Sequence, residues 1–295
     1  MKYPSICLVT ACHNHERYIE ETINSVLSQN YPNLQYVVIN DGSTDKSGQI
    51  IKKYKKYLHY YEDWSGYRKT VVPALNKAFS KTDGKIMGWL NSKNTLLSKS
   101  LFTIAEIFSQ LKQVEWLTGI ATTINDEGKI INARLRRKSI YDYLIGNWQV
   151  IQQESTFWRR SLWDRTGGYL KEQWAFDSEL WTRFFLEAEH YHVNTVLGTY
   201  RRIPQAQAIR NKDEFREITE KALRKMHNKV SKKKFLKAKL YGLGKKYFWP
   251  ILAIVPNKIY GKSPYLSEYS YKIISYSFDD NKWKIKKQNP FRKVI

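Results

Sequence analysis

The first part of the chain repeats one unit: a short apolar run, a polar cluster and an amphipathic helix. Residues 5–10 are apolar and β-branched, and residues 16–28 carry apolar side chains at helical spacing. The unit returns at residues 34–39, followed by the turn cluster at 40–45 and a Lys-rich helix through about residue 57. Such repetition predicts a mostly parallel sheet whose strands are joined by helical crossovers.

Further rounds of the unit place a strand at residues 85–90 and a helix at 99–111. Polar clusters follow Thr10, Ile39 and Leu90, which all stand at the ends of expected strands. In parallel α/β sheets, ligands bind beyond the carboxyl ends of the strands. This edge of the sheet is therefore the expected functional site.

Beyond residue 116 the pattern is mixed. Residues 120–133 are typical of a hairpin, 178–188 of an amphipathic helix and 191–200 of a single strand. From about residue 217 the sequence is basic and helical through 242, and aromatic-rich segments with weak periodicity follow. The α/β pattern therefore does not extend to the end of the chain.

The charge is also uneven. The sequence has 50 Lys and Arg against 27 Asp and Glu, a formal net charge of +23, which predicts an anionic partner such as phosphate, nucleic acid or lipid. Residues 228–295 hold 17 basic and three acidic residues, a net charge of +14. We therefore expect one α/β domain over residues 1–227 and a basic, aromatic extension over residues 228–295.

Several classes of protein are excluded by what the sequence lacks. Cys7 and Cys12 fit neither a metal knuckle, a redox CxxC pair nor a disulfide framework, which favours a reducing cytosol. The apolar runs are too short for a signal peptide or a membrane-spanning helix. No GxGxxG, P-loop, HExxH or nucleophile elbow occurs, so dehydrogenase, kinase and hydrolase functions have no support.

Asp41 is the first candidate for a binding residue. A carboxylate at the end of a buried strand is able to accept hydrogen bonds from a base or ribose, and the next helix N-terminus favours phosphate. Turn and capping chemistry selects the same Asp-Gly-Ser sequence, however, so this cluster alone leaves both interpretations open.

A series of motifs resembles the inverting glycosyltransferases of family 2. This resemblance implies the GT-A fold, a Rossmann-like mixed, mostly parallel sheet flanked by helices, here with a basic C-terminal extension. It also implies a nucleotide-sugar donor. The motifs keep their order over roughly residues 4–202 and lie at residues 5–14, 25–32, 37–45, 88–92, 152–162 (QQESTFWRRSL), 167–168 and 176–181 (FDSELW).

The resemblance assigns roles to individual residues at the expected edge. Thr10 and Asn14 would line the nucleotide pocket, and Asp41 would hold the base. Asn91, in the Leu-Asn-Ser motif, belongs to the same donor-binding group. The implied donor is a UDP- or GDP-sugar.

Asp177 matches the position of the family's catalytic carboxylate. In an inverting transfer this base removes the proton from the acceptor hydroxyl as that hydroxyl attacks the anomeric carbon. An aromatic setting that includes Trp181 would desolvate the carboxylate and make it a better base. The alternative is that Asp177 only caps the helix opening at Ser178. Glu154, Trp158 and Trp181 are candidates for the acceptor side.

The chain departs from the family at its metal-binding positions. Lys93 and Asn94 replace two aspartates, and no His follows Arg201 and Arg202. A divalent metal is therefore doubtful. In one interpretation Lys93, with Arg201 or Arg202, supplies the positive charge for the leaving diphosphate in a metal-independent transferase. In the other, the site is degenerate and the protein only binds nucleotide or glycan, with Lys93 pointing to solvent.

The extension combines lysines with aromatic residues over 229–260. This composition suits the headgroup region of an anionic bilayer. A nucleic-acid patch and an ordinary solvated subdomain are the alternatives, but no nucleic-acid motif is present, so no nucleic-acid partner is expected. We expect a cytoplasmic enzyme, peripheral at the inner face of the cell membrane, that acts on a glycan or lipid-linked acceptor in surface polysaccharide synthesis.

Overall fold

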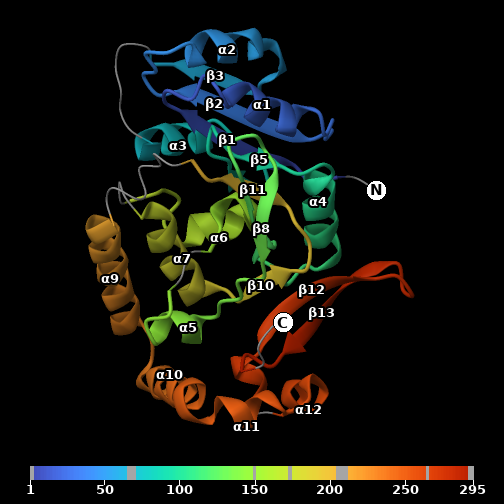
Figure 1. The fold of residues 1–295 in the computed structure, drawn as a ribbon, viewed down its shortest axis with the longest axis vertical. Coiled ribbons are helices and arrows are strands. Elements are labelled where there is room, and N and C mark those ends of the chain that lie inside the picture. The colour runs from blue at the N-terminus through green and yellow to red at the C-terminus, as the bar shows by residue number, and fades with distance from the viewer. Residues whose placement is uncertain are drawn as a thin grey trace.

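The computed structural model describes residues 3–64, 71–148, 151–171, 175–203, 212–263 and 266–291. A large sheet lies at its centre (Figure 1). Its strands are β1 (Ile6–Cys12), β2 (Leu34–Asn40), β3 (Tyr60–Asp63), β4 (Ile86–Trp89), β6 (Trp116–Thr118), β9 (Thr156–Arg159), β10 (His190–Val193), β12 (Tyr271–Ser277) and β13 (Lys282–Gln288). They run in the order β13-β12-β10-β6-β9-β4-β1-β2-β3.

A second, smaller sheet lies beside the carboxyl ends of the central strands. It has the order β5-β11-β7-β8 and consists of β5 (Thr95–Leu96), β7 (Ala121–Ile124), β8 (Ile130–Arg134) and β11 (Gly198–Arg201). β5 follows β4 directly and pairs with β11, so the loop between β4 and β5 is held between the two sheets. That loop carries residues 90–94.

Helices cover both faces of the large sheet. They are α1 (Ile19–Leu27), α2 (Ser47–Lys53), α3 (Val71–Ser80), α4 (Ser100–Gln110), α5 (Ile140–Leu144), α6 (Arg160–Arg165), α7 (Phe176–Glu187), α9 (Lys212–Lys229), α10 (Lys232–Leu243), α11 (Trp249–Ala253) and α12 (Asn257–Lys262). Four short turns of helix are η1 (Lys55–Tyr57), η2 (Gln153–Ser155), η3 (Gly244–Phe248) and η4 (Ser267–Tyr269). Alternate residues of β1 enter two separate cores, because successive side chains of a strand point to opposite faces.

The predicted repeating unit is confirmed. β1 pairs in parallel with both β2 and β4, and β2 pairs in parallel with β3. β9 lies antiparallel between β4 and β6. The sheet is therefore mixed but mostly parallel, as the sequence predicts, and the ends of β1, β2 and β4 lie at one edge.

Two predicted elements are each divided in the structure. The single strand expected at 191–200 is two strands, because the chain turns after Val193 and β11 enters the smaller sheet. The basic helix expected through residue 242 is interrupted at Val230 and Ser231, where the Ser231 hydroxyl accepts the Lys234 N–H, 3.2 Å away, and caps α10. Local spacing gave no sign of either break.

The residues after 227 extend the large sheet. β12 pairs in parallel with β10, and β13 lies antiparallel beside β12. Division of the chain at residue 227 remains a prediction, and the sheet is continuous across it. Among the helices in the described ranges, none has the length and apolarity needed to cross a membrane.

Candidate functional site

The loops after β1 and β2 are bound to each other at the carboxyl edge. Asn14 has a positive φ of 53°, and its N–H donates to the Ser43 hydroxyl at 3.1 Å. Its side-chain oxygen accepts the Thr44 N–H at 2.8 Å. Asp41 is buried next to this contact, and its N–H donates to the Cys12 carbonyl at 2.7 Å. The structure therefore brings Asn14 and Asp41 together in one rigid corner.

Thr10 is placed differently from Asn14. Its side chain is fully buried, and its hydroxyl lies 3.1 Å from the hydroxyl of Tyr36 inside the layer between the sheet and its helices. It stands two residues before the end of β1 and faces the core that contains Leu8 and Val38. Thr10 thus supports the corner from within, and its side chain has no surface to offer a ligand.

The loop after β4 adds a third group to the edge. Ser92 accepts or donates a hydrogen bond at 2.7 Å from Nδ1 of His15, which joins this loop to the one after β1. Lys93 is half-buried, and its ammonium lies 5.6 Å from the centre of the Tyr200 ring. Loss of hydration lowers the pKa of Lys93, although the nearby Glu154 partly opposes this. Lys93 is therefore directed into the protein edge and not into open solvent.

Asn94 is committed to the protein itself. Its side-chain oxygen accepts the Arg201 N–H at 2.8 Å, and its side-chain nitrogen donates to Glu154. Within the described part of the chain, no group of three or more His, Cys, Asp or Glu residues is arranged to hold a metal ion. With the Lys93 ammonium beside it, this position does not fit a divalent cation.

Arg201 is 1% exposed, and its guanidinium is surrounded by protein acceptors. Nε donates to the Lys93 carbonyl at 2.9 Å, and a terminal nitrogen donates to the Asp126 carbonyl at 2.7 Å. The other terminal nitrogen forms an ion pair with Glu21 at 2.5 Å. Arg201 thus fixes the loop that carries Lys93, and it does not face a ligand.

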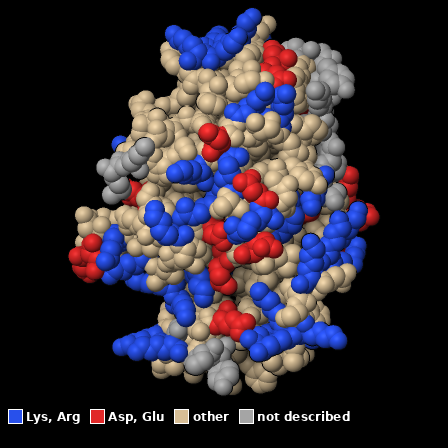
Figure 2. Space-filling model, turned by 180° about the vertical axis from the view of Figure 1, so that it is seen from behind, with Lys and Arg blue, Asp and Glu red and all other residues tan. Residues whose placement is uncertain are grey.

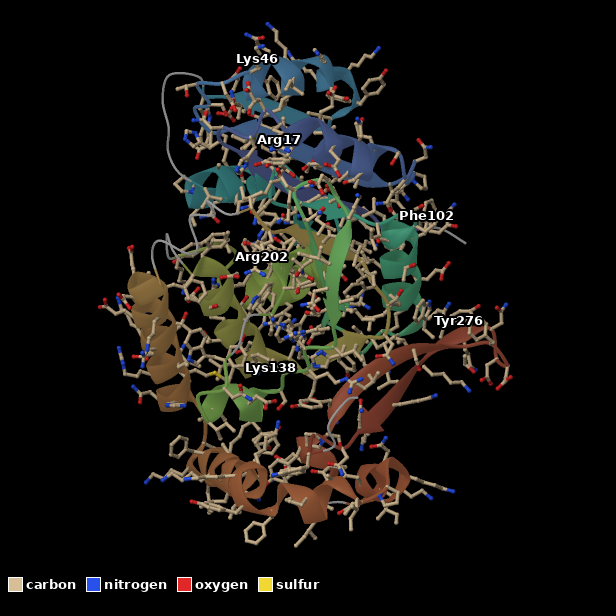
Figure 3. The ribbon with its side chains drawn as sticks, in the orientation of Figure 1. Arg17, Lys46, Phe102, Lys138, Arg202 and Tyr276 are labelled. Carbon is tan, nitrogen blue, oxygen red and sulfur yellow. The ribbon has the colours of Figure 1, made fainter. Side chains whose placement is uncertain are left out.

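Arg202 is exposed and belongs to the same part of the molecule. Its N–H donates to the Ile124 carbonyl at 2.9 Å, so its backbone stays in the smaller sheet while its side chain is free of the core. In Figure 3 its label lies near the middle of the molecule, between those of Arg17 and Lys138. Of the adjacent pair, Arg201 is buried and Arg202 is exposed.

Glu154 lies in η2, and its side chain contacts the loop after β4. Its Oε1 accepts from Asn91 at 3.4 Å and from Gln153 at 2.5 Å. Burial is the main cause that raises the pKa of Glu154 to about 7. The negative charge of Asp177 acts in the same direction, and the positive charge of Lys93 opposes it. A Cβ on Gly198 would lie 2.1 Å from the Glu154 carbonyl oxygen, so β11 is pressed against η2.

Asp177 is the second residue of α7, after Ala175 in the left-handed conformation. Its carboxylate is half-buried and accepts the Ser178 N–H at 2.8 Å. Burial raises the pKa of Asp177 to about 6. The contact with Ser178 agrees with a role at the helix end, and the raised pKa agrees with a role as a base.

Trp158 and Trp181, two of the acceptor-side candidates, lie in the core. Both are at most 1% exposed, and Trp181 stacks on Trp89 with the ring centres 5.7 Å apart. Trp158 belongs to β9, in the middle of the large sheet, and α7 brings Trp181 over it. As placed here, neither indole has surface to offer a sugar acceptor.

Neither Tyr200 nor His15 has a role assigned from the resemblance, although the sequence places His15 in the loop at the pocket edge, where it is able to touch a phosphate. The ring of Tyr200 lies against Lys93, and the pKa of its hydroxyl is raised by burial and by Glu154. His15 is held by Ser92, and burial together with Lys93 lowers its pKa to about 4, so its ring is neutral near pH 7. The only sequence signal was proximity, since Tyr200 precedes Arg201 and His15 follows Asn14.

Comparisons with known proteins agree with this architecture. The family model described as Glycosyl transferase family 2 matches residues 7–121, which include the loops after β1, β2 and β4. Residues 7–121 thus form a region of the glycosyl transferase family 2 type. The chain is also similar in fold to TarS of S. aureus, solved with UDP-GlcNAc, with a TM-score of 0.62 at 14% identity over 86% of this chain and 82% of that one. Its fold is GT-A.

A second solved structure with the same fold is the mannosyltransferase PcManGT of Pyrobaculum calidifontis, in complex with GDP-Man and Mn²⁺. It has a TM-score of 0.59 at 16% identity, over 91% of this chain and 79% of that one. Because both identities are low, these two likenesses concern the fold alone.

Two curated relatives are similar in sequence. TuaG of Bacillus subtilis (strain 168), a glycosyltransferase assigned to teichuronic acid biosynthesis, is 32% identical over 94 residues, 30% of this chain and 36% of that protein. The poly-beta-1,6-N-acetyl-D-glucosamine synthase of Staphylococcus epidermidis is 26% identical over 150 residues, 51% of this chain and 33% of that protein. The match thus spans about a third of the length of these relatives.

Proposed function

We propose that this protein is an inverting glycosyltransferase that moves a sugar from a UDP- or GDP-sugar to a hydroxyl group of a glycan or lipid-linked acceptor. The observation that carries the proposal is that Glu154 accepts hydrogen bonds from Asn91 and Asn94, on either side of Lys93, and lies near enough to Asp177 for that carboxylate to raise its pKa. These residues come from three distant parts of the sequence. The assignments of TuaG to teichuronic acid biosynthesis and of the S. epidermidis relative to poly-beta-1,6-N-acetyl-D-glucosamine synthesis favour surface polysaccharide synthesis as the setting.

Asp177 is the proposed base. Its raised pKa of about 6 leaves it ionised at neutral pH yet more basic than an ordinary aspartate. It takes the proton of the acceptor hydroxyl while that oxygen forms a bond to the anomeric carbon. The bond from this carbon to the nucleoside diphosphate breaks on the opposite face, which inverts the configuration.

Lys93 is the proposed partner of the leaving diphosphate. A partly dehydrated ammonium stabilises developing negative charge more strongly than one in water. Arg202 is a second cation in the same sheet region, whereas the Arg201 guanidinium is already paired with Glu21 and backbone carbonyls. In this proposal no catalytic step requires a metal ion.

The base is tested by Asp177→Asn, which removes the proton acceptor but keeps the shape of the side chain. We expect turnover, followed as release of UDP or GDP from a donor panel, to fall by about 10²- to 10⁴-fold. Asp164→Asn is the matched control, because Asp164 is exposed on α6. Unchanged turnover in Asp177→Asn contradicts the assignment.

The wild-type assay also decides between the two classes of function. Donor turnover that persists in excess EDTA supports a metal-independent transferase. Donor binding without release of nucleoside diphosphate, with every acceptor tried, supports instead a protein that binds nucleotide or glycan without catalysis. Strict dependence on Mn²⁺ or Mg²⁺ contradicts the role given to Lys93.

The proposal includes a location at the inner face of the cell membrane, where lipid-linked acceptors are found. Its support is the basic, aromatic composition of residues 229–260, which suits an anionic bilayer surface.

A further inference from the structure

The segment α10–α12 exposes an unusual number of large apolar side chains. Nine of them are between 39% and 78% exposed, whereas most large apolar residues of the chain lie in the two cores. They are Leu236, Leu240, Leu243, Tyr247, Phe248, Trp249, Ile251, Ile254 and Ile259. Contiguous exposed apolar surface of this kind marks a site of interaction.

On α10 the exposed leucines form a stripe. Leu236, Leu240 and Leu243 follow at spacings of four and three residues, which puts them on one side of the helix. Ala238 and Tyr241 are buried and join the core. The helix therefore has one apolar face that packs on the protein and a second that the fold itself does not use.

The charge around this stripe has a single sign. Residues 232–262 contain nine lysines and no Asp or Glu. Lys232, Lys233, Lys239, Lys246 and Lys258 are exposed. We name the exposed apolar and lysine side chains of residues 232–262 the basal surface.

The basal surface occupies one end of the molecule. In Figure 1 α10, α11 and α12 lie along the end opposite to β1–β3, and Figure 2 shows basic side chains projecting on both sides of that end. The carboxyl edge with Asp41 and Lys93 belongs to the other half. A large partner at the basal surface thus leaves the donor site open.

We propose that the basal surface is the face with which the protein lies on an anionic lipid bilayer, with its apolar side chains at the boundary between headgroups and acyl chains and its lysines at the lipid phosphates. Charge selects this occupant. A second copy of the chain would bring the exposed lysines of one copy against those of the other, which is unfavourable. Exposed leucines and isoleucines fit acyl chains, whereas a nucleic acid offers them no apolar counterpart.

This inference gives a defined surface to the location proposed above and rests on that location for its biological meaning. Binding to vesicles needs neither donor nor turnover, however, so it is measured separately. Release of UDP or GDP in the absence of vesicles reports on the transfer site alone. Failure of one experiment therefore leaves the other intact.

The test is co-sedimentation of the full chain with vesicles of phosphatidylcholine plus phosphatidylglycerol and with vesicles of phosphatidylcholine alone. We expect binding only to the anionic vesicles, and its loss at about 0.5 M salt, where surface charges are screened. The variant Leu236→Glu/Leu240→Glu/Ile254→Glu should bind at least about tenfold more weakly, because it removes insertion and adds three negative charges.

The control variant is Ile130→Glu/Ile131→Glu/Phe278→Glu, which makes the same changes at exposed apolar sites on β8 and in the β12–β13 turn. It should bind like the wild type, and thermal melting checks that both variants are folded. Three results overturn the proposal: no binding of the wild type to anionic vesicles, equal weakening by both variants, or a dimer that only the first variant dissociates.

Discussion

The carboxyl edge of the sheet and the basal surface are both basic, but they use their charge in opposite ways. At the edge, the Arg201 guanidinium is 1% exposed and bonded to several protein acceptors, and Lys93 is half-buried near Glu154. At the basal surface, exposed lysines occur without a single acidic residue between 232 and 262. The first arrangement favours one defined ligand group, and the second favours an extended anionic surface.

Within the edge, Lys93 is proposed to act on a ligand, whereas Arg201 is bonded to the protein itself. Lys93→Met should therefore have the larger effect on turnover. We expect the turnover number to fall by about 10²- to 10³-fold, because one stabilising group for the leaving diphosphate is lost. The midpoint of thermal unfolding should stay near that of the wild type, because removal of the ammonium also removes the free-energy cost of holding it partly dehydrated. Lys46→Met, a change at an exposed lysine of the neighbouring loop, is the control.

Arg201→Met should have the opposite profile. Loss of the guanidinium leaves the carbonyls of Lys93 and Asp126 without their donor, and we expect unfolding to become easier by about 3 kcal/mol. Urea denaturation measures this. If Arg201→Met were as stable as the wild type but inactive, Arg201 would be a ligand-binding residue and the contrast with Lys93 would be wrong.

The pH dependence of turnover sharpens the assignment of the base. Because the pKa of Asp177 is raised to about 6, activity should rise with pH and reach half its maximum near pH 6. A raised carboxyl pKa also means that ionisation opposes folding, so the wild type loses stability as the pH rises from about 4 through 6. Asp177→Asn should therefore gain thermal stability over the wild type at pH 7, and much less at pH 4.

The smallest expected effect belongs to Glu154→Gln. Since the negative charge of Asp177 raises the pKa of Glu154, a charge on Glu154 acts on Asp177 in the same direction, and removing it lowers the pKa of Asp177. The midpoint of the pH profile should move to lower pH by less than about one unit. Movement to higher pH, or loss of the pH dependence, would mean that Glu154 itself is the group that titrates in turnover.

The sequence predicted those parts of the fold that repeat a strong local pattern. Almost every residue of β1, β2 and β4 is buried, so these strands are continuous apolar runs that can be recognised in the sequence. β10 and β11 read as one strand because the turn between them has no glycine or proline. β12 and β13 were not predicted, since pairing with β10 decides their structure and spacing within the segment does not.

For the site, the sequence predicted which loops meet but not which side chains face outward. Asn14, Asp41, Asn91 and Lys93 gather at one edge, as loops at the ends of parallel strands must, and Glu154 joins them from the start of the antiparallel strand β9. Thr10 and Trp158 stand on strands, where a step of one residue changes the face, and both turn into a core. Arg201 is a cation whose partners, Glu21 and three carbonyls, come from distant segments that spacing does not connect.

The continuous sheet across residue 227 has a consequence for reach. Nine strands at about 4.8 Å per step span roughly 40 Å from β3 to β13. β12 and β13 adjoin the helices of the basal surface, and β1, β2 and β4 hold the loops with Asp41 and Lys93. A protein that rests on a bilayer by this surface would hold its reaction centre at a fixed distance above the membrane. Acceptors whose growing end lies at that distance would be elongated.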